Sequence, residues 1–405
     1  MSISERPEAE DTSSDYPVFA PYAQLGAKLV GSNALGDSQQ GTVAISADGT
    51  TAVVGGSNDN EGTGAIWIFV RSGDSWTQQG AKLTGSDGVG APGLGTSVAI
   101  SEDGNTVIAG GSGDNGLVGA AWVFTRTNGI WTQQGAKLVG SGYVGEPMQG
   151  AAVGLSADGN TAAIGGNGDD YAVGAVWIFT RSTGTWSQSG SKLVGSGYSG
   201  KANQGAALAL SGDGQTLVIG SALEVQDTAP VWVFANSGGW QQQGNYLTGS
   251  GGVPDPYGQN TALAVSHDGS TFVLGENQDN GQTGATWIFT RTSGIWTQEG
   301  SKLVGTGATG TAGQGGAVAI SSDGKTIAVG GDDDNSDEGA VWVFQKNSGT
   351  WLQCGEKLVG TGASGKALQG TSVALSGDGR TILSGGPGDN SMTGATWVFA
   401  AQFIA

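Results

Sequence analysis

Carboxylates are concentrated in one short segment of this chain. Five of the seven residues from 332 to 338 are acidic, namely Asp332, Asp333, Asp334, Asp337 and Glu338, and Asn335 lies among them. Negative charges at this density repel one another unless water or a cation neutralises them, and Ca²⁺ binds through oxygen ligands of this kind. We therefore predict a weak calcium site here. The alternative is that these side chains cap a loop through hydrogen bonds to backbone N–H groups.

Aromatic and amide side chains form a second group of candidates, in segments that are expected to be loops. The residues concerned are Tyr143, Tyr171, Tyr198, Tyr257, Gln149 and Gln204. A tyrosine ring offers an apolar face and a polar hydroxyl, which suits stacking on a sugar ring beside amides and carboxylates. We predict ligand binding by these six residues. The alternative is ordinary loop packing for the tyrosines and structural hydrogen bonds for the glutamines.

Histidine and cysteine occur once each, as His267 and Cys354. One cysteine cannot form a disulfide within the chain, and the pair cannot supply a zinc site. His267 is expected in an exposed turn, which argues against a nucleophile activated by histidine. A glycosidase needs only two carboxylates, but no carboxylate pair stands out. We therefore predict no catalytic residues and a protein that is not an enzyme.

The charge balance is strongly acidic. The net charge is −19, with only 16 Lys and Arg among 405 residues. Nucleic-acid binding requires clustered basic side chains, so we predict none, and no apolar run is long enough for membrane insertion. Residues 1–17 carry neither a basic nor an apolar stretch of the kind a signal peptide has, and we expect a disordered acidic tail there.

A repeat runs through almost the entire chain. The triplet Trp-x-Phe begins at Trp67, Trp122, Trp177, Trp232, Trp287, Trp342 and Trp397, always 55 residues apart. In the first unit, two short apolar runs flank Asp48-Gly49, which is a strong hairpin signal. A third strand contains Trp67 and a fourth contains Trp76. A fixed period of this length indicates a repeat architecture.

Seven units of four antiparallel strands predict an all-β, seven-bladed β-propeller. One domain is expected over residues 18–405. The last unit lacks its fourth strand, and Tyr22 stands before Gly26 as Trp76 stands before Gly80. We therefore predict that residues 18–30 complete the last blade and close the ring. The expected blades span about 31–85, 86–140, 141–195, 196–249, 250–305, 306–360, and 361–405 plus 18–30.

The two ends of such a propeller differ in their loops. With the strands of a blade labelled A to D, the A–B and C–D turns are short and uniform at one end. The B–C loops and D–A crossovers at the other end are longer and vary between units. Variable loops on a rigid scaffold commonly carry binding, so we place the predicted site on the B–C and D–A loop face.

The last unit resembles the FG-GAP repeat of integrin α-chain propellers and bacterial surface proteins. The resemblance lies in Gln369-Gly370, in Gly385-Gly386-Pro387 and in the stretch Gly394–Phe399. It implies the propeller fold and an extracellular or cell-surface location. The calcium loops of integrin blades cannot be carried over, because a tight Ser-x-Asp-Gly turn stands in their place. A kelch-like alternative keeps the fold and changes the family.

These observations lead to a functional hypothesis. We predict a non-catalytic, lectin-like propeller that binds carbohydrate on its B–C and D–A loop face, with Ca²⁺ as a cofactor. Several weak sites on similar blades would supply avidity. The alternative is a protein-interaction or structural module of a surface or secreted assembly. A carboxylate-based enzyme acting on glycosides is the third possibility.

Overall fold

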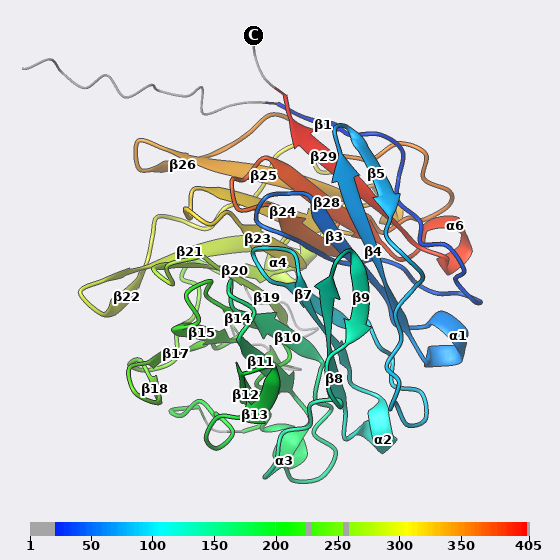
Figure 1. Cartoon of the computed structure of the whole chain (residues 1–405). Coiled ribbons are helices and arrows are strands. Elements are labelled where there is room, and N and C mark those ends of the chain that lie inside the picture. The colour runs from blue at the N-terminus through cyan, green and yellow to red at the C-terminus, as the bar shows by residue number, and fades with distance from the viewer. Residues whose placement is uncertain (1–20, 199, 224–228, 254–258, 403–405) are drawn as a thin grey trace, which may run out of the picture.

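Seven antiparallel sheets are arranged as the blades of a ring in this protein (Figure 1). The structure is a computed structural model, and it describes residues 21–198, 200–223, 229–253 and 259–402. Figure 1 shows the first blade, in blue, next to the last blade, in red, so the two ends of the chain meet. The seven-bladed, all-β prediction is confirmed.

The strands of the first three blades follow one another along the chain without exception. Blade one contains β2 (Thr42–Ile45), β3 (Thr51–Gly56), β4 (Ala65–Ser72) and β5 (Ser75–Gln78). Blade two contains β6 (Ser97–Ile100), β7 (Thr106–Gly111), β8 (Ala120–Thr127) and β9 (Ile130–Gln133). Blade three contains β10 (Ala152–Leu155), β11 (Thr161–Gly166), β12 (Ala175–Ser182) and β13 (Thr185–Gln188).

Blade four contains β14 (Leu208–Leu210), β15 (Thr216–Ile219), β17 (Trp232–Asn236) and β18 (Trp240–Gln242). Blade five contains β19 (Gln259–Val265), β20 (Thr271–Glu276), β21 (Ala285–Thr292) and β22 (Ile295–Gln298). The extra strand β16 (Ala222–Leu223) follows β15 in the chain but pairs with β19 of blade five. Blade six contains β23 (Ala317–Ile320), β24 (Thr326–Gly331), β25 (Ala340–Asn347) and β26 (Thr350–Gln353).

Blade seven joins the two ends of the chain. It contains β27 (Ser372–Leu375), β28 (Thr381–Gly386), β29 (Ala395–Ala401) and β1 (Tyr22–Gln24). Tyr22 pairs with Ala401, and its hydroxyl donates a 2.5 Å hydrogen bond to the Gly379 carbonyl. Burial raises the pKa of the Tyr22 phenol. The predicted closure by an N-terminal strand is confirmed, although residues 18–20 of the expected segment lie outside the described residues.

Tryptophans of the repeated triplet fill the space between neighbouring blades. All seven have no exposed surface, as expected for core residues. The indole N–H of Trp67 donates to the Ser32 carbonyl at 2.8 Å. A Cβ on Gly31 would lie 2.2 Å from the Trp67 ring, so this crossover position requires glycine. The buried aromatic area stabilises each contact between blades.

The B–C loops of six blades contain one short turn each. These are α1 (Asp59–Gly62), α2 (Asp114–Leu117), α3 (Asp169–Ala172), α4 (Asp279–Gln282), α5 (Asp334–Asp337) and α6 (Asp389–Met392). Two central residues of each turn have positive φ, such as Asn60 at 53° and Glu61 at 59°, so the chain reverses rather than continuing as a helix. Within the described ranges, no helix has the length and apolar character to cross a membrane.

Candidate functional site

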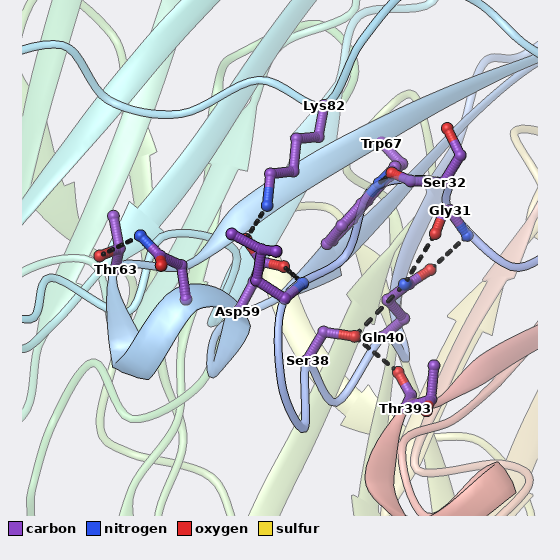
Figure 2. Close-up of polar contacts among 11 residues, drawn as sticks. Gly31, Ser32, Ser38, Gln40, Asp59, Thr63, Trp67, Lys82 and Thr393 are labelled. Carbon is purple, nitrogen blue, oxygen red and sulfur yellow. Dashed lines mark hydrogen bonds and ion pairs between the residues drawn. The ribbon is translucent and has the colours of Figure 1, made fainter.

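The B–C aspartates, which lie on the predicted binding face, form ion pairs with lysines, as Figure 2 shows for Asp59 and Lys82. Asp59 has no exposed surface, and one of its oxygens lies 2.5 Å from Nζ of Lys82. Its other oxygen accepts the Leu35 backbone N–H at 2.7 Å. The pair recurs as Lys137–Asp114, Lys192–Asp169, Lys302–Asp279, Lys357–Asp334 and Lys28–Asp389. One oxygen binds the lysine and the other binds a backbone N–H of the D–A crossover, as Leu35 shows for Asp59. These aspartates therefore hold the D–A crossover in place.

Blade four replaces this ion pair with aromatic packing. Tyr246 stands where the other blades have the lysine, as the alignment of Asn245-Tyr246-Leu247 with Ala81-Lys82-Leu83 shows. Its ring centroid lies 5.9 Å from that of Tyr198 and 6.3 Å from that of Trp232. The corresponding acidic position falls at residues 224–225, outside the described residues. Tyr198 therefore has a packing role in blade four.

The remaining residues of the predicted ligand site differ in their exposure to solvent. Tyr171 and Tyr143 are exposed, at 71% and 38%. Gln149 and Gln204 are buried, at 0% and 3%. Each glutamine amide bonds both the N–H and the carbonyl of a crossover glycine, Gly140 or Gly195. Tyr257 lies outside the described residues. The two glutamines therefore fasten the crossovers of their own blades.

The acidic segment of blade six is divided among separate partners. Asp334 pairs with Lys357, Asp337 pairs with Lys366, and Glu338 accepts from Asn335. Burial chiefly raises the pKa of Asp332 and of Asp333, and neighbouring carboxylates raise both further. Among the residues that the structure describes, no three potential metal ligands converge. The calcium site remains a prediction, and this geometry lends it no support.

A cavity of about 900 Å³ opens at the opposite end of the ring, where the A–B turns meet. We call it the A–B mouth. Its lining comes from the Ser-x-Asp-Gly turns of all seven blades: Ala47, Asp48, Glu102, Asp103, Ala157, Asp158, Gly212, Asp213, His267, Ser322, Gly377 and Asp378. Sequence reasoning assigned binding to the other end of the propeller. It therefore missed the feature that brings the single histidine and many carboxylates into one cavity.

Backbone hydrogen bonds close a circle around this mouth. In six blades the donor is the N–H of the residue between Ser and Asp of the turn. The bonds are Ala47–Glu102, Glu102–Ala157, Ala157–Gly212, His267–Ser322, Ser322–Gly377 and Gly377–Ala47, at 2.9 to 3.2 Å. In blade four the donor is shifted by one residue, and Asp213 N–H bonds the His267 carbonyl at 3.0 Å. The Gly212 N–H is thus left out of the circle.

The aspartates of the turns keep the mouth negatively charged. Ser46 Oγ donates to Asp48 at 2.5 Å, and the Thr50 N–H donates at 2.9 Å. Partial burial opposes ionisation of Asp48, but these hydrogen bonds outweigh it and lower its pKa. The same balance lowers the pKa of Asp103, Asp158 and Asp268. The aspartates are turn formers, as the sequence predicted, and they also set the charge of the mouth.

Chemically distinct side chains appear at only three positions of the circle. These are Glu102 in blade two, His267 in blade five and Ser322 in blade six, against Ala or Gly in the other blades. The imidazole leans over Gly212, since a Cβ built there would lie 2.3 Å from its Nδ1. Ser322 leans the other way, with Oγ 2.8 Å from a Cβ built on Gly377. His267 and Ser322 therefore point apart, so this arrangement is not a Ser-His nucleophile.

The mouth narrows into a smaller space of about 150 Å³. Seven residues line both parts, so the two spaces adjoin. The inner part adds the last residues of six innermost strands: Ile45, Ile100, Leu155, Val265, Ile320 and Leu375. We call these six residues the aliphatic collar. The channel thus changes from carboxylates at its entrance to branched hydrocarbon further in.

Comparison with known proteins agrees with the fold. No protein-family model matches the chain, and no curated protein matches it. A periplasmic gluconolactonase of Pseudomonas aeruginosa, PpgL, is similar in structure, with 17% identity, a TM-score of 0.52 and coverage of 79% of this chain and 86% of the other. Hydrazine synthase of Kuenenia stuttgartiensis has 13% identity and a TM-score of 0.54, and the match covers 91% of this chain and 96% of the other. A protein from Lactobacillus plantarum has 16% identity and a TM-score of 0.52, and the match covers 79% of this chain and 85% of the other. Likeness at these identities shows the fold alone.

One sequence-based prediction must be corrected. The chain was expected to be a non-catalytic, carbohydrate-binding propeller and not an enzyme. That expectation is contradicted, because the structural neighbours include a gluconolactonase, which is an enzyme. The physical argument behind it also fails, since it treated His267 as an isolated turn residue. His267 in fact lines the A–B mouth, among carboxylates.

Proposed function

We propose that this protein is a hydrolase that opens a small polyhydroxylated lactone at the A–B mouth. The observation that carries the proposal is His267, the only histidine of the chain, at the wall shared by the mouth and the inner channel. The gluconolactonase among the structural neighbours supports this choice of substrate class. A concave site with a few polar groups is the usual setting for such chemistry.

His267 is assigned the role of general base. Its imidazole takes a proton from a water molecule as the water oxygen bonds to the lactone carbonyl carbon. The ring C–O bond then breaks, and the imidazolium returns the proton to the departing ring oxygen. We assign the Gly212 N–H, which is free of the backbone circle, to hydrogen bonding with the carbonyl oxygen. A hydroxy acid is the product.

The negative charge of the A–B mouth suits a reaction that converts a neutral lactone into an anionic hydroxy acid. A neutral polyol lactone can donate its hydroxyl hydrogen bonds to ionised carboxylates such as Asp103 and Asp158. The hydroxy acid ionises at neutral pH, and the same carboxylates then repel it. Substrate binding and product release are therefore both favoured by one ring of negative charge.

The test is a pH-stat assay of the purified full chain with D-glucono-δ-lactone, after subtraction of the spontaneous rate. Proton release above that rate, lost in His267→Gln, supports the proposal. Equal rates with and without protein for gluconolactone and a panel of γ- and δ-lactones contradict it.

We also propose that the chain is an FG-GAP-type propeller that works outside the cytoplasm. The motif residues Gln369-Gly370 and Gly385-Gly386-Pro387 support the family, and the word periplasmic in the name of the Pseudomonas neighbour supports the location. Fractionation of the native host tests this location. Recovery of the protein with a cytosolic marker alone contradicts it.

A further inference from the structure

Strand alternation places two different rings of side chains along the central channel. Residues i and i+2 of a strand face the same side, so Ile45 and Ala47 face the channel while Ser46 faces away. Ser46 is buried accordingly, and Ile45 is partly exposed. The same spacing repeats in the other blades, with Ile100 before Glu102 and Val265 before His267. The aliphatic collar therefore lies directly inward of the position assigned to the reacting carbonyl.

The collar offers no polar side chain. Each of its six residues is Ile, Leu or Val. Water held among such side chains makes few hydrogen bonds, so an apolar group from a ligand displaces it favourably. Among the described residues that line this space, hydrogen-bonding side chains lie only at its outer edge, where they are Glu102, His267 and Ser322. A ligand that fills both parts must have a polar head and an apolar extension.

The size of the inner space limits that extension. About 150 Å³ is available, and a methylene group needs about as much room as a water molecule, roughly 30 Å³. The space therefore holds roughly five carbons. A straight chain can pass a ring of branched side chains, whereas a second polyol ring would leave its hydroxyls without partners.

We propose that the substrate carries a short straight alkyl chain, which lies in the aliphatic collar while the lactone head stays at His267. This inference rests on the proposed hydrolase function and extends its substrate class from polyhydroxylated lactones to lactones that carry an alkyl chain. The carboxylates of the mouth favour a neutral head over an anionic one. The occupant is thus a neutral amphiphile rather than a fatty acid.

The experiment is a homologous series of γ-lactones, from γ-valerolactone to γ-undecalactone, assayed with the full chain. Burial of each methylene predicts a gain in kcat/KM of roughly fourfold, up to about five side-chain carbons, and then a plateau. A flat series contradicts the proposal. A gain that continues without limit also contradicts it, because it would indicate adsorption outside a bounded space.

A variant tests whether the alkyl chain of the substrate lies in the aliphatic collar. Ile100→Phe fills part of the collar and is expected to reduce the ratio of kcat/KM between γ-nonalactone and γ-valerolactone at least tenfold. Ile130→Phe is the matched control, because Ile130 is 67% exposed at the start of the outer strand β9. An unchanged ratio in Ile100→Phe contradicts the proposal. Leu375→Phe repeats the test from another blade if Ile100→Phe fails to fold.

A binding measurement separates this inference from the function on which it rests. Calorimetry with n-hexanol needs no catalysis, and its heat is expected in the wild type and lost in Ile100→Phe. If hexanol binds in the collar but no lactone is opened, the hydrolase proposal fails and the alkyl site stands. If lactones are opened without any chain-length effect and hexanol does not bind, the alkyl site fails and the hydrolase stands.

Discussion

The imidazole of His267 occupies the space that a side chain on Gly212 would need. A Cβ built on Gly212 lies 2.3 Å from Nδ1 and 2.7 Å from Cγ of His267. The two residues occupy the same turn position in neighbouring blades, and blade four is also where the backbone circle shifts its donor to Asp213. The lack of a side chain at Gly212 thus decides where the only imidazole of the chain points.

Gly212→Ala is expected to reduce lactone hydrolysis by displacing His267. Gly212 does not have a positive φ, so alanine fits its backbone and the melting temperature should stay within a few degrees. We expect kcat/KM to fall at least tenfold, since the general base leaves its position. Gly316→Ala is the control, because its nearest contact is an ordinary 3.4 Å. Full activity in Gly212→Ala would show that the position of the imidazole is unimportant.

Lys82→Met is expected to destabilise the propeller. It leaves the fully buried Asp59 carboxylate without its cation, and breaking a buried pair in this way costs about 3–5 kcal/mol. Urea unfolding measures the loss. The exposed Lys201→Met should change little. Adding Asp59→Asn to Lys82→Met should restore part of the stability, because the buried charge is gone. A decrease in unfolding free energy of less than about 1 kcal/mol in Lys82→Met would contradict the role of this pair in holding the D–A crossover in place.

Glu276 makes the stability of blade five depend on pH. It stands where most other blades have the second glycine of Gly-Gly, and it has no exposed surface. Burial, followed by the nearby Asp279, raises its pKa from 4.5 to about 8. The folded state therefore holds a proton that the unfolded state has released, so stability falls as pH rises from about 4.5 to about 8.

Glu276→Gln tests this dependence. The amide cannot ionise, so the difference in unfolding free energy between variant and wild type should grow in favour of the variant across that pH window. Each pKa unit corresponds to about 1.4 kcal/mol, which sets an upper bound of about 5 kcal/mol at pH 8 or above. Urea titrations at pH 5 and pH 8.5 supply the comparison. Parallel stability curves for the two proteins would refute the assignment.

Tyr22→Phe tests the closure of the ring. It removes the hydroxyl that bonds the Gly379 carbonyl and leaves that acceptor unsatisfied, which costs about 1–3 kcal/mol. Tyr22→Ala also opens a cavity and should cost more, about 3–5 kcal/mol. The matched control is Tyr143→Phe on an exposed crossover residue. Equal stability of Tyr22→Ala and the wild type would mean that β1 does not hold the ring closed.

The repeat made the fold predictable from the sequence, because Trp-x-Phe and Asp-Gly recur at one period and fix four strands in each unit. Tyr22 predicted the closing strand in the same way. The partner of each B–C aspartate was not predictable by that route, since Lys82 lies in a different part of the repeat from Asp59. The substitution of Tyr246 for this lysine in blade four was a signal that would have pointed to the pairing.

The A–B mouth was missed for a related reason. The turns that form it are short and uniform, and uniform turns carry no obvious sign of function. Comparison of the residue between Ser and Asp across all seven units would have singled out His267, Glu102 and Ser322 against small residues. Strand alternation then places that residue toward the channel. The circle of backbone bonds itself depends on how the blades meet, which one unit of sequence cannot reveal.

The most direct test of the account is the rate of lactone opening by His267→Gln. The amide keeps a side chain of similar size but cannot accept a proton, so we predict a fall in kcat/KM of about a hundredfold or more. Glu61→Gln, on an exposed loop at the other end of the ring, should retain wild-type activity. If His267→Gln opens lactones as fast as the wild type, the A–B mouth is not a hydrolytic site that depends on this imidazole.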